Sequence, residues 1–403
     1  MKYPKYLIIA LMFLISCQNK SNSISYETIA VNPIQKTTIE RSKLVTLIDI
    51  VQLEKSDAHL IGEIWTLIPY PNFIIVNSEE PGVYKKNGDF LFKIGRRGKG
   101  PGEYLSSMAV DYYNEQFTIL DRSQQKIITY DSNGIFQNEY VIGIFAQALK
   151  NIKEHTLIYT ESDPNEYNKM LFLLANNYNI IDNSFHINTI KTYMSIFDKN
   201  NFTMYNDTLI FFNSFDNNIY IVIIHNDSLS ISARYYLDFG KYKIPKTFHD
   251  NEFRNIAEYC TALYASNYAH KLYGIFFETD NNVFFSFGFR DEFYFAIYCK
   301  INKKTFVIEK IYDDIIFQGL TFSSFIDESF YYFYSDNQIF LVMDAYIFKG
   351  NIEKMKQTMS EEDWINYEIN NHKVLNIYNN LNINDNPIIF IFNINPDITN
   401  YFL

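Results

Sequence analysis

Three cations and four glycines lie together in residues 94–104, where the sequence reads IGRRGKGPGEY. The guanidinium and ammonium groups could donate charge-assisted hydrogen bonds to a carboxylate, a phosphate or an acidic sugar. A carboxylate and a phenol end the same segment. The candidate ligand-binding residues are therefore Arg96, Arg97, Lys99, Glu103 and Tyr104.

A structural explanation competes with this site. Gly98, Gly100 and Gly102 would let the backbone turn tightly, and Glu103 could neutralise one of the arginines. A nucleotide site is excluded, because Lys99 is followed by Gly-Pro instead of Ser or Thr and a helix. The glycines are also too closely spaced for a dinucleotide fingerprint.

Other chemistry is poorly represented. The histidines lack paired ligand spacing, and no Ser or Cys stands in a recognisable nucleophile context, so we predict no catalytic residues and no cofactor. Residues that are distant in the sequence can still assemble a metal site, so bound Ca²⁺ or Zn²⁺ is not excluded by the spacing. We expect Asp313 and Asp314 to be solvated turn charges. The histidines are His59, His155, His186, His225, His249, His270 and His372.

Composition narrows the class of protein. The 403 residues carry a net charge of -11, which argues against nucleic acid as a partner because phosphate-binding proteins concentrate positive charge. Aromatic residues make up 18% of the chain, mostly Phe and Tyr, and these favour strands. Nothing in the sequence sets an oligomeric state.

Residues 1–17 are typical of a lipoprotein signal peptide. Lys2 and Lys5 precede an apolar stretch, and Leu-Ile-Ser-Cys ends at Cys17. We expect Cys17 to be acylated and to hold the protein on a membrane. Because Gln18 follows in place of Asp, we predict the outer membrane, and because no acidic cluster follows Cys17, we predict its periplasmic side. An ordinary secretory signal is the alternative.

The mature chain repeats a hairpin pattern. Strand-type residues flank Asn87-Gly88 and again Asn133-Gly134, and Tyr84 and Tyr130 are 46 residues apart. That period is the size of one propeller blade. Residues 108–110, 116–121, 126–130 and 135–140 would form the four strands of one such blade.

Later segments complete the predicted ring. Hairpins are expected within residues 171–186, 219–237 and 294–311, and strands 44–53 and 387–392 would pair to close the ring. Helices are expected over 253–264 and after a capping box at Ser360, packed on the flank or, alternatively, as a lid. Cys260 and Cys299 could form a disulfide or stay as separate thiols.

The chain resembles the six-bladed β-propeller lipoproteins of Bacteroidota, which are NHL-like propellers. The resemblance implies an all-β, six-bladed propeller of four-stranded blades over residues 44–403, after a signal peptide (1–17) and a tether and lead-in (18–43). That family brings no established catalytic residues. We therefore expect a lipid-anchored binding or scaffold module for a peptide, a glycan fragment or a partner protein; the alternative is a metal-dependent lyase or lactonase. The resemblance rests on residues 60–64, 87–88, 94–104, 121, 130–131 and 386–389.

Overall fold

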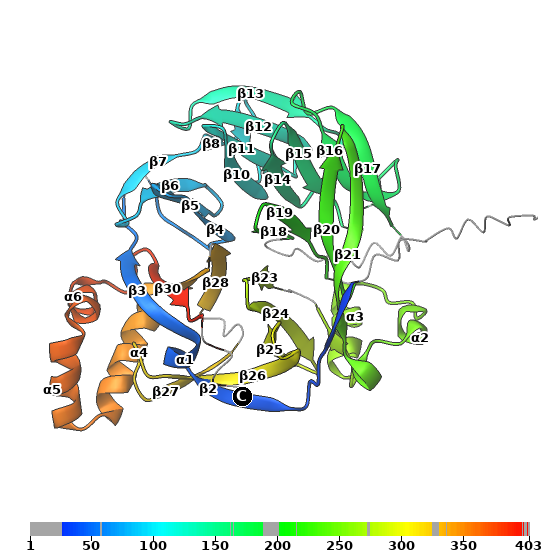
Figure 1. Ribbon diagram of the computed structural model, residues 1–403. Helices are drawn as coiled ribbons and strands as arrows, with labels where there is room; N and C mark the ends of the chain where they lie inside the picture. Colours follow the sequence, from blue (N-terminus) through cyan, green and yellow to red (C-terminus); the bar gives the residue numbers. More distant parts are fainter. Residues whose placement is uncertain are drawn as a thin grey trace, which may run out of the picture.

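The computed structural model describes residues 26–401 apart from 57–58, 162, 164, 188–200, 215, 272–274, 325–329, 336, 397 and 399–400. Its sheets stand around a central axis in an all-β, propeller-like fold (Figure 1). The signal segment 1–17 with Cys17 and the predicted tether 18–25 lie outside the described residues.

The first three sheets are antiparallel meanders of four strands each. Their first strands lie toward the centre of the ring in Figure 1. The strands are β4 (Thr66–Pro69), β5 (Phe73–Asn77), β6 (Gly82–Lys85) and β7 (Phe90–Lys93); β10 (Ala109–Tyr113), β11 (Gln116–Asp121), β12 (Lys126–Asp131) and β13 (Phe136–Val141); β14 (Ala148–Ile152), β15 (His155–Tyr159), β16 (Lys169–Leu174) and β17 (Ile180–His186).

The next three sheets are built on the same plan and carry additional strands from elsewhere in the chain. They contain β18 (Phe202–Tyr205), β19 (Thr208–Phe211), β20 (Asn218–His225) and β21 (Ser228–Asp238); β22 (Ala269–His270), β23 (Phe276–Glu278), β24 (Asn282–Phe289), β25 (Glu292–Cys299), β26 (Lys304–Asp313) and β27 (Leu320–Ser323); β28 (Phe330–Ser335), β29 (Gln338–Met343) and β30 (Ile388–Ile394). The predicted hairpins at 171–186, 219–237 and 294–311 are therefore confirmed.

The two Asn-Gly turns are confirmed as well. Gly88 and Gly134 have φ values of +95° and +76°, which an L side chain rarely adopts. In both hairpins the register shifts within the strands, after Val83 and after Thr129, as expected for a turn that ends in a bulge. The predicted four-stranded blade over residues 108–140 is present as β10 to β13.

Apolar side chains fill the space between neighbouring sheets. Strands in the middle of a sheet are covered on both faces, so β24 is buried over its whole length. Each pair of adjacent sheets shares its own cluster of buried aliphatic and aromatic residues, and one such cluster joins the first sheet to the last. The core is thus a ring of interfaces between sheets.

The N-terminal segment runs along the outer edges of three successive sheets, drawn in blue in Figure 1. β3 (Val45–Gln52) pairs antiparallel with β30, which confirms the predicted closure. Two further strands were not predicted: β1 (Glu27–Ala30) pairs parallel with β21, and β2 (Lys36–Glu40) pairs parallel with β26. The lead-in before residue 44 therefore supplies edge strands and a short helix, α1 (Arg41–Leu44).

Helices are inserted at two places. α3 (Ile256–Tyr264) begins three residues later than predicted, because Asn255 is its N-cap and accepts a hydrogen bond from the Glu258 N–H. Ser360 caps α5 (Glu361–Asn370) as predicted. The remaining helices were not predicted: α2 (Lys246–His249), α4 (Ala345–Thr358), α6 (His372–Asn380) and the 3₁₀ turn Gly240–Tyr242.

The inserted helices α4 to α6 pack on the flank of the last sheet. Phe348 and Ile352 of α4 share a buried cluster with Phe390 of β30. The flank position is therefore confirmed for this insertion, which lies outside the ring in Figure 1. Five blades are counted in the structure, so the predicted number of six is not confirmed, although six sheets hold four or more strands.

Candidate functional site

The glycine-rich loop connects β7 to β10, at the crossing from the first sheet to the second. Two short strands, β8 (Arg96–Arg97) and β9 (Glu103–Tyr104), pair in parallel within it. Arg96 Nε lies 2.6 Å from Glu103 Oε1, and Arg97 Nη1 lies 3.0 Å from Glu79 Oε2. Both predicted guanidinium groups are thus paired with carboxylates.

Glu103 is held by the backbone of its own loop. The Gly100 N–H donates to Glu103 Oε2 at 2.7 Å, and this bond, followed by the charge of Arg96, lowers the pKa of the carboxyl group. A Cβ on Gly98 would come within 2.0 Å of the same oxygen. Tyr104 is fully buried, which raises the pKa of its phenol, and it faces the sheet interface instead of a ligand. Lys99 is exposed.

The other residues considered from the sequence serve structure. His59 Nδ1 and Nε2 lie 2.7 Å from Tyr84 Oη and from the Glu80 carbonyl oxygen. Cys260 and Cys299 are both free, so of the two alternatives the structure has the separate thiols. Asp313 is buried and paired with Arg41 at 2.8 Å, so the expectation of a solvated charge is wrong. Among the described residues no three His, Cys, Asp or Glu side chains gather as metal ligands.

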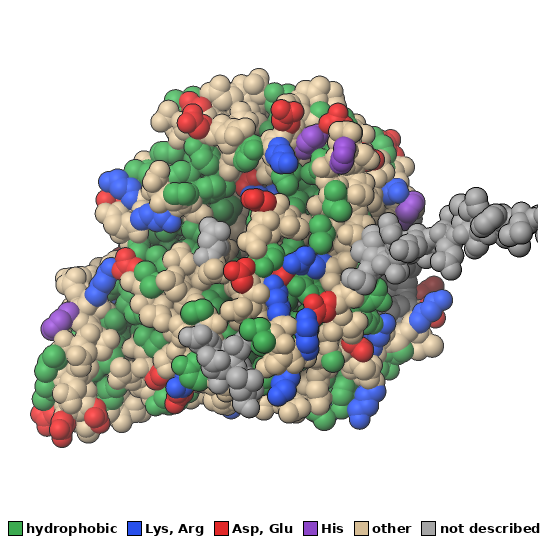
Figure 2. All heavy atoms as spheres, viewed as in Figure 1, with side chains coloured by type: hydrophobic (Ala, Val, Ile, Leu, Met, Phe, Trp, Pro, Cys, Tyr) green, Lys and Arg blue, Asp and Glu red, His purple; other side chains and the backbone are tan. Residues whose placement is uncertain are grey.

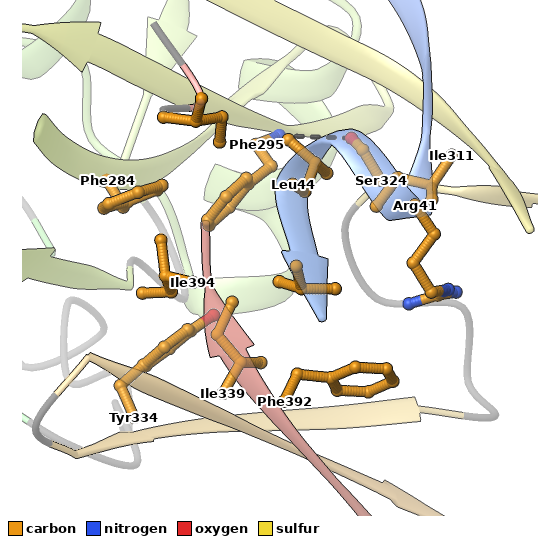
Figure 3. A pocket seen from close by; sticks show the side chains of 12 residues that line it. Arg41, Leu44, Phe284, Phe295, Ile311, Ser324, Tyr334, Ile339, Phe392 and Ile394 are labelled. Atoms are coloured by element: carbon orange, nitrogen blue, oxygen red, sulfur yellow. Dashed lines mark hydrogen bonds between the residues drawn. The ribbon is translucent and has the colours of Figure 1, made fainter. Parts of the chain in front are cut away.

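An apolar pocket lies between the fifth and sixth sheets (Figure 3). Phe284, Phe295 and Phe392 line it, and Ser324 Oγ accepts a hydrogen bond from the Phe295 N–H at 3.2 Å. Its volume of about 40 Å³ has room for little more than one water molecule. This pocket is a gap in the packing and not a ligand site.

A larger concave feature lies where the N-terminal segment crosses from the fourth sheet to the fifth. We call it the crossover groove; it is lined by residues 30–32, 35–37, 238–242 and 303–307. Its volume of about 950 Å³ is in the range of ligand-binding clefts. The groove exists because β2 pairs with β26 only from Val307 onward, which leaves the start of β26 uncovered by β2.

Positive charge dominates the crossover groove. Lys36, Lys241, Lys303 and Lys304 line it, against one acidic residue, Asp238. In the described part of the chain, neither Lys241 nor Lys304 forms an ion pair. Lys and Arg side chains also gather around the centre and lower part of the face drawn in Figure 2.

Two of these lysines are held by neighbours. Burial alone would lower the pKa of Lys36, but its contacts with Tyr294, Glu292 and Glu309 raise it above the ordinary value. Lys303 Nζ lies 2.5 Å from Glu27 Oε1. The groove therefore has two fixed ammonium groups and two that are free to meet an anion.

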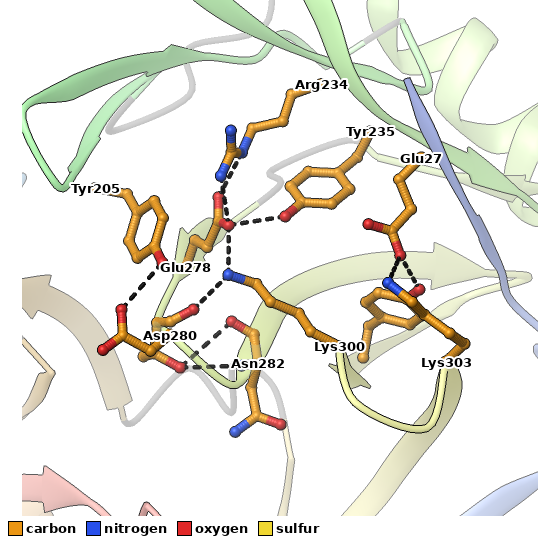
Figure 4. Close-up of polar contacts among 11 residues, drawn as sticks. Glu27, Tyr205, Arg234, Tyr235, Glu278, Asp280, Asn282, Lys300 and Lys303 are labelled. Atoms are coloured by element: carbon orange, nitrogen blue, oxygen red, sulfur yellow. Dashed lines mark hydrogen bonds and ion pairs between the residues drawn. The ribbon is translucent and has the colours of Figure 1, made fainter. Parts of the chain in front are cut away.

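An ion cluster centred on Glu278 lies near the Glu27–Lys303 pair at the edge of the groove (Figure 4). Arg234 contacts both oxygens of Glu278 at 2.7 Å, while Tyr235 Oη and Lys300 Nζ lie 2.7 Å and 2.5 Å from Oε1. The Glu278 side chain is fully buried. Hydrogen bonding to Glu278 raises the pKa of Arg234, so the guanidinium stays charged.

Glu278 joins the fourth sheet to the fifth. Arg234 and Tyr235 come from β21, Glu278 from β23, and Lys300 from the turn before β26. Four donors contact its two oxygens, three at Oε1 and one at Oε2, so the carboxylate holds the two sheets together. The cluster fixes the position of β26, whose start forms one wall of the groove.

Sequence reasoning missed the crossover groove. Its lysines lie on three segments that are far apart in the chain, and none stands in a motif. The closest available signal was the turn at residues 300–304, KINKK, which carries three lysines in an acidic protein. Such a turn indicates a positive surface, but it does not show which other segments of the chain lie beside it.

Comparison with solved structures supports the fold. A protein of Bacteroides fragilis NCTC 9343 that is described as exported aligns with a TM-score of 0.72 at 17% identity, over 91% of this chain and 99% of that chain. A DUF4221 family member from Bacteroides vulgatus ATCC 8482 aligns at 0.47 and 8% identity, over 87% and 98%, which is too distant to support any conclusion. No curated protein is similar enough in sequence to count as a relative.

Two further findings concern the whole chain. Within the part that the structure describes, no helix is long and apolar enough to cross a bilayer. The family described as domain of unknown function DUF4934 matches residues 26–393, which include every sheet and the whole crossover groove. The chain therefore belongs to the DUF4934 family.

Proposed function

We propose that this protein is a lipid-anchored binding or scaffold module of the cell envelope, with the crossover groove as its binding surface for an anionic partner. The observation that carries the proposal is the groove itself, where four lysines and one aspartate line a cleft in a chain of net charge -11. A peptide, a glycan fragment or a partner protein that bears carboxylates or phosphates would fit this charge.

The envelope location is supported by two observations. The signal pattern ending at Cys17 is typical of a lipoprotein, and the structurally similar Bacteroides fragilis protein is described as exported. We propose that acylated Cys17 holds the protein at the outer membrane, on the periplasmic side.

We also propose that the ring has six blades of the NHL-like kind. Six sheets of at least four strands are present, and six shared clusters connect them in a closed cycle. β3 supplies the edge strand of the last sheet, which removes an open edge.

The glycine-rich loop is a weaker second surface. Arg96 and Glu103 pair with each other, Arg97 pairs with Glu79, and Tyr104 is buried between the first two sheets. If the loop contacts a ligand, Lys99 would carry that contact. The alternative function, a metal-dependent propeller enzyme with Ca²⁺ or Zn²⁺ in the channel, has no specific observation in its favour.

Neutralising the free lysines of the groove tests the proposal. We would titrate wild-type protein and the double variant Lys241→Gln/Lys304→Gln with oligogalacturonate and with oligoglutamate, using calorimetry at low salt. The variant should bind about tenfold or more weakly, since each charged contact contributes about 1 kcal/mol or more. The matched control is Lys354→Gln, an exposed lysine of α4 far from both surfaces in sequence, which should bind as the wild type does. Failure of the wild type to bind either polyanion would contradict the proposal.

A further inference from the structure

The crossover groove lies beside the start of the described chain. Glu27 of β1 pairs with Lys303, and the chain continues along the groove from Ala30. Only eight residues, 18–25, separate Cys17 from Tyr26. Any eight-residue chain spans at most about 30 Å when fully extended. An acyl group on Cys17 would therefore keep this edge of the ring close to the bilayer.

Exposed apolar side chains stand beside the lysines of the groove. Ile301 is 72% exposed and lies two residues before Lys303, and Ile34 is 57% exposed on the crossing between β1 and β2. Tyr26, at the start of the chain, is 49% exposed. Aliphatic and aromatic side chains next to lysines are the composition of surfaces that rest in the headgroup region of a bilayer.

We propose that the edge of the ring that carries the crossover groove rests on the membrane, where its free lysines contact the headgroups of anionic phospholipids. This inference rests on the proposed anchor at Cys17, and for the groove it names an anionic lipid surface in place of a soluble ligand. A phosphodiester headgroup would supply the acidic partner that Lys241 and Lys304 lack among the described residues. Ile34 and Ile301 would enter the interface on either side of it.

The inference also orients the molecule. Figure 1 shows β8, in the glycine-rich loop, across the ring from the crossing between β1 and β2. With the groove against the bilayer, the loop and Lys99 would face the aqueous compartment. A soluble partner could then reach the loop while the anchor holds the opposite edge.

Fluorescence quenching by brominated lipid measures which edge faces the bilayer. The full lipidated chain with Ile301→Trp would be reconstituted into vesicles of brominated phosphatidylglycerol and, separately, of brominated phosphatidylcholine. The matched control is Ile135→Trp, because Ile135 is 61% exposed on the turn between β12 and β13. Signals are compared with the wild type, which contains two tryptophans.

We expect at least twofold quenching at position 301 in phosphatidylglycerol vesicles, with none at position 135. Adding Lys241→Gln/Lys304→Gln should remove the quenching. Equal quenching at both positions, no quenching at position 301, equal quenching in both lipids, or failure of the chain to stay with vesicles would each overturn the inference.

The titrations with soluble polyanions separate this inference from the proposed function. If oligogalacturonate or oligoglutamate binds the groove and position 301 is not quenched, the groove is an anion site that faces away from the membrane. If position 301 is quenched and neither soluble polyanion binds, the groove is specific for the lipid surface. Loss of both signals overturns both proposals.

Discussion

The glycine-rich loop and the crossover groove both concentrate positive charge, and they do so in opposite ways. In the loop, Arg96, Arg97 and Lys99 are neighbours in sequence, and two of them are neutralised by Glu103 and Glu79. In the groove, the lysines come from distant segments, and two remain without an acidic partner in the described residues. Cations that are close in sequence thus form the less available of the two surfaces.

The two surfaces differ because the charges of the loop are needed to hold a tight connection between two sheets. The loop must turn from the edge of one sheet to the centre of the next, and Glu103 holds that turn by accepting the Gly100 N–H and pairing with Arg96. In the groove, the same kind of crossing is covered by the N-terminal segment, and the side chains of β26 and residues 238–242 are left to line a cleft. The charge there is not needed to hold a turn.

The largest expected effect is at the ion cluster that supports the groove. Glu278→Gln would leave the mostly buried Arg234 and Lys300 without their shared carboxylate, so we expect the free energy of unfolding to fall by about 3–5 kcal/mol in urea denaturation. The matched control is Asp280→Asn, which touches the same cluster only through Tyr205 and should cost much less. A loss at Glu278 below about 1 kcal/mol would show that the wall of the groove does not depend on the cluster.

Acid should destabilise the groove side of the ring through His270. This residue lies in β22, the first strand after the groove residues 238–242. Burial lowers the pKa of His270 to about 4 from an ordinary value of 6.5. Between these values the unfolded chain binds more protons than the folded chain, so stability should fall as pH drops from 6.5 to 4, by about 3 kcal/mol. His270→Phe should remove much of this pH dependence, measured as the urea midpoint at several pH values.

His59 provides the comparison on the loop side. Burial also lowers its pKa, and its ring contacts Tyr84 and the Glu80 carbonyl. We expect His59→Phe to change the acid dependence less than His270→Phe does. If the urea midpoint of His270→Phe still falls with pH as steeply as that of the wild type, His270 is not the group responsible.

The smallest of the three effects concerns the loop. Gly102 has a φ of +70°, and a Cβ there would come within 2.4 Å of Phe136 Cγ. Gly102→Ala should therefore destabilise the fold by about 2 kcal/mol, seen as a lower thermal midpoint. Gly350→Ala is the control, because Gly350 lies in α4 with no atom near its Cβ position, and it should stabilise by about 0.5–1 kcal/mol. If both substitutions changed the thermal midpoint equally, the backbone conformation of Gly102 would not be needed, which would contradict a structural role of the loop.

Much of the fold could be predicted because its signals are local. The Asn-Gly turns, the alternating aromatic and aliphatic strands, the cap at Ser360 and the pairing of β3 with β30 were all predicted. β1 and β2 were not, because their short sequences have no strong strand pattern and pair only with the edges of sheets formed about 200 residues or more later in the chain. Helices α4 and α6 were missed because their apolar residues alternate with many polar ones.

By itself, the sequence determined the class of fold, the closure of the ring and the position of the cationic loop, since turns, periodicity and charge are properties of short segments. Only the tertiary structure decided which charges are free. An ion pair depends on which side chains meet, so Asp313 is buried against Arg41, Glu103 neutralises Arg96, and Lys241 and Lys304 line the same cleft. The crossover groove follows from where the N-terminal segment lies on the ring, which no local pattern encodes.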